Sequence, residues 1–143
     1  MTKPSKSAVL AWTRLVRAQE TAMSSIQSAL KKAKLPALEW YDVLLELENG
    51  GPMRPRDLQS RLLLAQYNLS RLLDRMKVAG LVTQTPCAED ARGHLVDISE
   101  TGKALRRQMW PVYANALHQA VGVKLNDDEA NALAGLLDRL RVH

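Results

Sequence analysis

Helical periodicity runs through most of this chain and changes in one place, and that pattern limits the folds open to it. Apolar residues recur at intervals of three and four over residues 7–34, which puts them on one face of a helix. The same spacing predicts further helices at about 37–48, 55–62, 66–78, 100–121 and 126–140. Residues 81–85 and 94–98 are short β-like runs joined by a polar, turn-forming segment, which predicts a hairpin.

The helices at the two ends of the chain carry broad apolar faces. Examples are Leu15 and Ile26 near the start, and Leu133, Leu136 and Leu140 near the end. A core built from the roughly 60 residues between them is too small to cover all these faces, because that many residues bury only part of their own surface. We therefore expect two copies of the chain to intertwine as a two-fold dimer.

Residues 55–80 contain two predicted helices joined by a tight turn, which is the arrangement of a helix-turn-helix. The second helix of that motif lies in the major groove of DNA, where it needs side chains that form hydrogen bonds. The candidates on this helix are Gln66, Tyr67, Asn68, Ser70, Arg71 and Arg75. A polar helix face is also what solvation alone produces, and the helix by itself leaves this alternative open.

The predicted hairpin adds a second possible DNA contact. Arg92 is long, charged and planar, so it suits a narrow minor groove with its enhanced negative potential. Asp90, two residues earlier, could orient Arg92 through a charge-assisted hydrogen bond. The alternative is an ordinary turn salt bridge. A helix-turn-helix followed by a wing is more specific than either part alone.

The charge of the chain permits nucleic-acid binding without proving it. Lys and Arg number 20 against 15 Asp and Glu, for a net charge of +5. Residues 1–34 hold seven Lys and Arg against one Glu, so this segment alone carries +6. A basic surplus of this kind is typical of proteins that bind polyanions, although solvated surfaces can show it too.

Several other classes of protein are disfavoured. We expect no membrane span and no secretory signal, since apolar runs are short and charged residues interrupt the start. The single cysteine, Cys87, excludes an internal disulfide framework and suggests a reducing, cytoplasmic setting. His94, His118 and His143 are too scattered for a metal site. No phosphate loop and no nucleophile beside a base appear, so we expect no cofactor and no enzyme.

Six short segments resemble one known family. They are residues 58–62 (LQSRL), 68–76 (NLSRLLDRM), 79–82 (AGLV), 90–92 (DAR), 99–102 (SETG) and 125–129 (LNDDE). In this order they resemble the MarR family of winged helix-turn-helix transcriptional regulators. The resemblance implies a homodimer built from the terminal helices, which binds a pseudo-palindromic operator in double-stranded DNA. It also implies a small-molecule or redox signal that weakens binding.

These observations together give a specific prediction. We expect a mainly α fold with a small two- or three-stranded β wing, a winged helix-turn-helix within an intertwined helical dimer. We expect residues 1–143 to form a single MarR-like domain, with a helical dimerisation region at 1–37 and 100–143 and a DNA-binding region at 38–99. The expected function is a repressor released by a small ligand. The alternative is a winged-helix protein-interaction module without DNA binding.

The resemblance places a ligand pocket where the dimer helices meet the winged region. Aromatic walls suit a planar or phenolic ligand, and nearby cations suit an anionic one. The aromatic candidates are Trp12, Trp40, Tyr41, Trp110 and Tyr113. Packing within the dimer core is the alternative role for these side chains. Cys87 has acidic neighbours, Glu89 and Asp90, which argues against a reactive thiol.

The sequence departs from the family pattern just before the second helix of the motif. Ala65 stands where the family usually has a capping Ser or Thr, and Tyr67 is bulkier than the usual residue. We therefore expect the DNA-reading helix to be less well capped, at a cost of about 1 kcal/mol.

Overall fold

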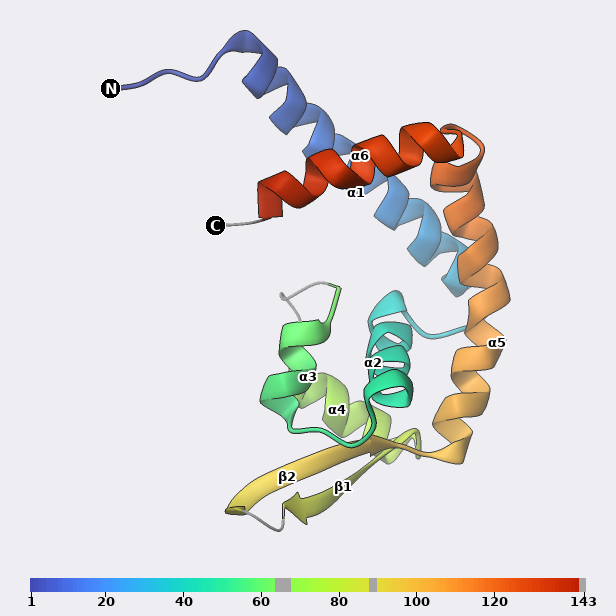
Figure 1. The fold of residues 1–143 in the computed structure, drawn as a ribbon. Helices are drawn as coiled ribbons and strands as arrows, with labels where there is room; N and C mark the ends of the chain where they lie inside the picture. The colour runs from blue at the N-terminus through green and yellow to red at the C-terminus, as the bar shows by residue number, and fades with distance from the viewer. Residues whose placement is uncertain (64–67, 88–89, 142–143) are drawn as a thin grey trace. The chain divides into compact units, whose positions relative to one another are not determined.

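The computed structural model describes residues 1–63, 68–87 and 90–141, with the backbone alone at 90–92. Two compact units make up the chain: one spans Leu30–Val112, and the other combines Met1–Ala29 with Tyr113–His143. The first holds a helical bundle with a two-stranded antiparallel sheet, and the second is helical (Figure 1). The predicted fold class, mainly α with a small β wing, is confirmed.

The order of elements follows the sequence prediction closely. They are α1 (Lys6–Lys32), α2 (Leu38–Gly50), α3 (Pro55–Arg61), α4 (Leu69–Val78), β1 (Val82–Cys87), β2 (Asp90–Ile98), α5 (Glu100–Leu117), the π-helix η1 (His118–Gly122) and α6 (Asp127–Arg141). The α1 helix ends before Pro36, as predicted, and Lys34 has a left-handed φ of 59° just after the helix. Gly51 ends α2 with a φ of 75°, a left-handed conformation that favours glycine.

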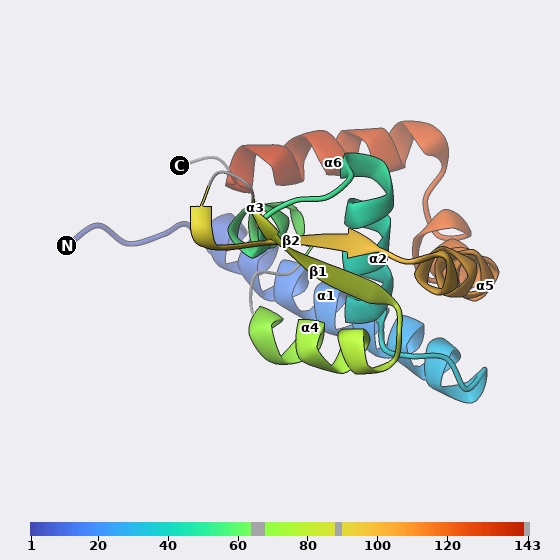
Figure 2. The same cartoon turned by 90° about the horizontal axis from the view of Figure 1, so that it is seen from below.

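The core of the first unit lies where α2, α3 and α4 meet the hairpin. Leu44, Leu47, Leu58, Met76 and Val96 are completely or almost completely buried there. The α4 helix contacts β1, and Figure 2 shows it running beside that strand. The helix-turn-helix and the wing therefore share one apolar core, which fixes their mutual position.

The hairpin is longer than the sequence indicates. Residues 86–93 were expected to be turn, but β1 extends to Cys87 and β2 already begins at Asp90. This part of the prediction was wrong because cross-strand pairing holds even Pro86 in extended conformation, opposite His94. In a two-stranded sheet both strands are edges, so a proline without an N–H is tolerated.

A third segment joins the sheet at one point. Met53 and Val96 form an antiparallel bridge in which each N–H donates to the other residue's carbonyl, at 3.1 and 2.8 Å. The wing thus has two strands and one additional bridge, within the predicted range of two or three strands.

The start of α5 is fixed to the base of the wing by Ser99 and Gly102. The Ser99 hydroxyl donates to the Gly80 carbonyl at 2.6 Å and accepts from the Gly102 N–H at 3.0 Å. A Cβ at Gly102 would collide with the carbonyl oxygen of Leu81. Glycine is needed here because α5 and the turn after α4 approach so closely.

In the second unit, helix starts are well capped but helix faces are left uncovered. Asn126 and Glu129 form a reciprocal capping box at the start of α6, with N···O distances of 2.8 and 3.0 Å. Yet Leu136 and Leu140 of α6 are 56% and 66% exposed, and Trp12 of α1 is 65% exposed. In the part of the chain that the structure describes, no helix is long and apolar enough to cross a membrane.

Candidate nucleic-acid interface

The helix expected to read DNA begins at Leu69, three residues later than the sequence indicates. Asn68 is its N-cap, and the Asn68 Oδ1 atom accepts a hydrogen bond from the Arg71 N–H at 3.2 Å. The predicted start at residue 66 was therefore wrong, and so was the expectation of a poor cap. The cap comes from Asn68 rather than from position 65, because an Asn side chain accepts from the N3 amide as well as Ser or Thr does. Gln66 and Tyr67 lie outside the described residues.

The two faces of α4 differ as the periodicity predicts. Leu69, Leu72, Leu73 and Met76 are buried against the core. Ser70, Arg71 and Arg75 are exposed, as is the capping residue Asn68. The polar side chains proposed for DNA contact therefore lie on the solvent side of α4. Their contact with DNA stays a prediction.

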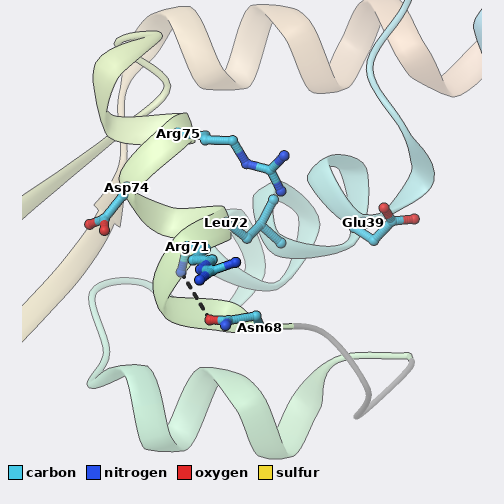
Figure 3. A pocket seen from close by; sticks show the side chains of 6 residues that line it. All are labelled: Glu39, Asn68, Arg71, Leu72, Asp74 and Arg75. Carbon is cyan, nitrogen blue, oxygen red and sulfur yellow. Dashed lines mark hydrogen bonds between the residues drawn. The ribbon is translucent and has the colours of Figure 1, made fainter.

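A cavity of about 550 Å³ lies between α4 and the start of α2. Arg71 and Arg75 line it from α4, and Glu39 lines it from α2. In Figure 3 the Arg75 side chain extends from α4 toward the side on which Glu39 of α2 lies, and Asp74 of α4 also lines the cavity. Two guanidinium groups one helical turn apart are available to phosphate groups on this side of α4, where the carboxylates of Glu39 and Asp74 also line the cavity.

A second hollow of about 520 Å³ lies on the other side of α4, bounded by α3 and the hairpin. Ser70 of α4 lines it, together with four polar residues that the sequence analysis did not propose for DNA contact: Arg56, Gln59, Gln84 and His94. Arg56 and Gln59 are exposed and lie three residues apart on α3. Because this spacing places them on one face of the helix, the sequence alone could have identified them as a polar pair. Gln84 and His94 come together with α4 only through the tertiary fold.

The wing residues lie in a strand rather than in a loop. The backbone of Asp90 and Arg92 belongs to β2, and Asp90 pairs with Cys87 across the hairpin. The pairing is irregular at this point, because Pro86 pairs with His94 and the next residue, Cys87, pairs with Asp90. The proposed orienting role of Asp90 and the minor-groove contact of Arg92 stay predictions.

Cys87 has a neighbour that sequence reasoning could not detect. The Arg54 Nη2 atom donates a hydrogen bond to the Cys87 Sγ atom at 3.4 Å, although the two residues are 33 positions apart. The fold thus brings the positive charge of Arg54 to this thiol from a distant part of the chain. Cys87 is also buried, which limits access to it.

The aromatic residues proposed for ligand binding divide between the two units. Tyr41 and Trp110 stack within the first unit, with ring centroids 6.1 Å apart and an interplanar angle of 19°. Trp40 packs against the core of the same unit. Trp12 and Tyr113 belong to the second unit. A pocket that combines all five stays a prediction.

Next to this aromatic pair, α2 and α5 are joined by an ion pair. The Arg106 Nε atom of α5 donates to the Glu48 carboxylate of α2, and both side chains are largely buried. An ion pair removed from water holds its partners more firmly than an exposed one. The first turns of α5 are thus attached to the winged unit by both Glu48–Arg106 and Tyr41–Trp110.

Residues 35–93 match the sequence model of the MarR family. This segment covers α2, α3, α4, β1 and the beginning of β2. The winged helix-turn-helix of this chain matches the MarR family. The resemblance predicted from the sequence is therefore confirmed.

MarR-family structures share the fold of the chain almost from end to end. Sco3205, a MarR family regulator from Streptomyces coelicolor solved in complex with DNA, is 19% identical with a TM-score of 0.86, covering 98% of this chain and 89% of its own. BpsR from Bordetella bronchiseptica, whose DNA binding is regulated by 6-hydroxynicotinic acid, is 23% identical with a TM-score of 0.85 and 99% coverage of both chains.

A mutant of MarR from E. coli, complexed with operator DNA, is 24% identical with a TM-score of 0.80, covering 98% of this chain and 100% of its own. In sequence, an uncharacterised helix-turn-helix transcriptional regulator of Bacillus anthracis is 23% identical over 94% of this chain and 88% of its own length. These similarities extend the MarR-type fold beyond residues 35–93 to the terminal helices.

Proposed function

We propose that this protein is a DNA-binding transcriptional regulator in which α4 enters the major groove and the β1–β2 wing reaches the adjacent minor groove. The observation that carries the proposal is the exposed polar face of α4, with Ser70, Arg71 and Arg75, beside a hairpin that holds Arg92. Helices of this kind read base edges, and arginines in wings suit narrow minor grooves. Sco3205 and E. coli MarR, which share the fold, were both solved with DNA.

The proposed active form is a homodimer. In a single chain, the apolar faces of α1 and α6 are exposed at Leu10, Trp12, Leu136 and Leu140. Exposed apolar faces of this size mark surfaces that a partner covers, and a second copy of the same chain is the partner that the family resemblance supports. Two-fold symmetry would set the two α4 helices about one turn of DNA apart, roughly 34–36 Å.

We further propose that the protein is a repressor released by a small planar or anionic ligand. BpsR supports this, since 6-hydroxynicotinic acid regulates its DNA binding. In this chain, the exposed Trp110 stacks on the buried Tyr41 next to the point where α5 joins the winged unit. A ligand that contacts these rings could alter the α2–α5 attachment and hence the position of the reading helix.

The experiment that tests DNA binding is a salt titration of affinity. The full chain is titrated by fluorescence anisotropy against the duplex upstream of its own gene and against a scrambled duplex of equal length. A regulator that neutralises phosphates should show a steep linear fall of log K with log salt, together with a preference for its own promoter. Weak binding with little salt dependence would favour the alternative, a winged-helix module that docks on protein.

A further inference from the structure

Asp42 is a charged residue buried in the helix-turn-helix unit, where charge is costly. Its side chain on α2 is only 7% exposed, and its neighbours Val43 and Leu44 belong to the hydrophobic core. The Asp42 Oδ2 atom accepts a hydrogen bond from the Leu63 N–H at 2.7 Å. A buried carboxylate normally has such a partner, and here the partner is backbone rather than a cation.

Leu63 lies at the point where the chain leaves α3 on its way to α4. The helical hydrogen bonding of α3 stops at Leu62, whose backbone is extended with φ −68° and ψ 148°. The Leu62 side chain is buried, but that of Leu63 is 60% exposed and therefore provides little anchoring by burial. The bond from the Leu63 N–H to Asp42 thus fixes the direction of the chain five residues before the cap of α4.

The negative charge of Asp42, which accepts the hydrogen bond from Leu63 and thus anchors the chain there, reduces the stability of the fold. The pKa of Asp42 is raised from its ordinary 3.8 to about 6, and burial is the largest cause. The hydrogen bond from the Leu63 N–H lowers the pKa, whereas the nearby carboxylates of Glu46 and Glu39 raise it further. These two glutamates lie on α2 itself, while the uncharged N–H is the group that faces Asp42 from the α3 side. On α5, Arg106 is paired with Glu48.

We propose that Asp42 is a positioning residue for the DNA-reading helix: its carboxylate, when charged, holds the exit from α3 and thereby the start of α4. This inference rests on the proposed DNA-binding function. A charged acceptor forms a stronger hydrogen bond to a backbone N–H than a neutral one, and an isosteric amide would fill the same volume. Protonation of Asp42 therefore loosens the anchor, and operator affinity becomes sensitive to mild acidification.

The test compares wild type with Asp42→Asn at pH 5.0 to 8.0, using the full chain and the duplex upstream of its own gene. At pH 7.5 we expect wild type to bind about fivefold more tightly, the difference between a charged and a neutral acceptor. Below pH 5.5 the two affinities should converge, because wild type is then protonated too. The thermal midpoint of Asp42→Asn should equal or exceed that of wild type at pH 7.5.

Two matched variants separate positioning from general charge effects. Glu46→Gln removes a carboxylate that raises the pKa of Asp42. The affinities of Glu46→Gln and of Asp42→Asn should therefore converge at a lower pH than those of wild type and Asp42→Asn. Asp57→Asn removes one exposed negative charge from α3 and should keep a constant affinity ratio to wild type between pH 5.5 and 7.5. An Asp42→Asn defect that is the same at every pH, or that follows a fall in thermal midpoint, would overturn the proposal.

Hydrogen exchange tests the anchor without DNA. At pH 7.5 the Leu63 amide should exchange faster in Asp42→Asn than in wild type, while the Met76 and Val96 amides of the core keep their rates. If wild type does not bind its own promoter DNA, the proposed function is wrong. Faster exchange of the Leu63 amide in Asp42→Asn would even then show that the Asp42 carboxylate holds Leu63. If wild type binds DNA and Asp42→Asn matches it in affinity and exchange, the positioning role alone is wrong.

Discussion

Arg71 occupies the first turn of α4 on its exposed face, where an arginine can reach a base edge. Arg71→Ala should weaken binding to the specific operator by about 1–3 kcal/mol if the guanidinium contacts a guanine. Anisotropy titrations on operator and random duplexes measure this, with Arg107→Ala, an exposed arginine of α5, as the control. An equal loss on both duplexes would mean that Arg71 contacts a phosphate instead.

Arg92 belongs to β2, two positions after Asp90. Arg92→Ala should lower affinity for any duplex with a narrow minor groove, because the charge interacts with groove potential rather than with one base. Binding is compared on operators whose flanking steps are A-tracts or G·C pairs. If wild type and Arg92→Ala discriminate between these flanks equally, the wing does not read the minor groove.

Asp42 also predicts a pH dependence of folding. Its pKa is raised to about 6 in the folded chain against an ordinary 3.8, so the folded state holds a proton that the unfolded state has released. Stability therefore falls as pH rises through this window, and above it the full penalty remains. Asp42→Asn should raise the free energy of unfolding at pH 7.5 by up to about 3 kcal/mol. Urea titrations should show that gain shrinking toward pH 4; a constant gain would contradict the burial argument.

At the scale of single elements, α4 shows how a cap defines a helix. Asn68 fixes its start by accepting from the Arg71 N–H, and the helix is only ten residues long. Short helices depend on their caps and on packing, since few internal hydrogen bonds offset the cost of nucleation.

Asn68→Ala should therefore lower the free energy of unfolding by about 1 kcal/mol. Urea denaturation of the DNA-free protein measures this loss. Ser70→Ala, an exposed substitution on the same helix, is the control and should have a smaller effect. Equal stability of Asn68→Ala and wild type would show that packing of Leu69 and Leu72 alone fixes the helix start.

At the scale of the whole molecule, the uncovered apolar faces of α1 and α6 lead to the proposed dimer. Leu136 is more than half exposed in the isolated chain, and burying a leucine contributes about 1.5–3 kcal/mol. Leu136→Glu acts twice in a symmetric dimer and introduces two charges into the interface. It should raise the dissociation constant of the dimer at least a hundredfold, by roughly 3 kcal/mol or more.

Sedimentation equilibrium of wild type and Leu136→Glu tests this prediction. Val78→Glu is the matched control, since Val78 is an exposed apolar residue of α4 in the winged unit. It should leave the dimer intact. A wild-type chain that sediments as a monomer at micromolar concentration would contradict the proposed assembly.

The sequence by itself determined the element types, the buried stripe of α4 and the family, because periodicity, glycine and proline positions act over a few residues. It could not determine the extent of the hairpin, where pairing between β1 and β2 overrides the turn preference of residues 86–93. Nor could it place Arg54 beside Cys87, His94 beside α4, or Asp42 beneath Leu63. Those neighbours are 20 or more residues apart in the chain, and only the packing of the core brings them together.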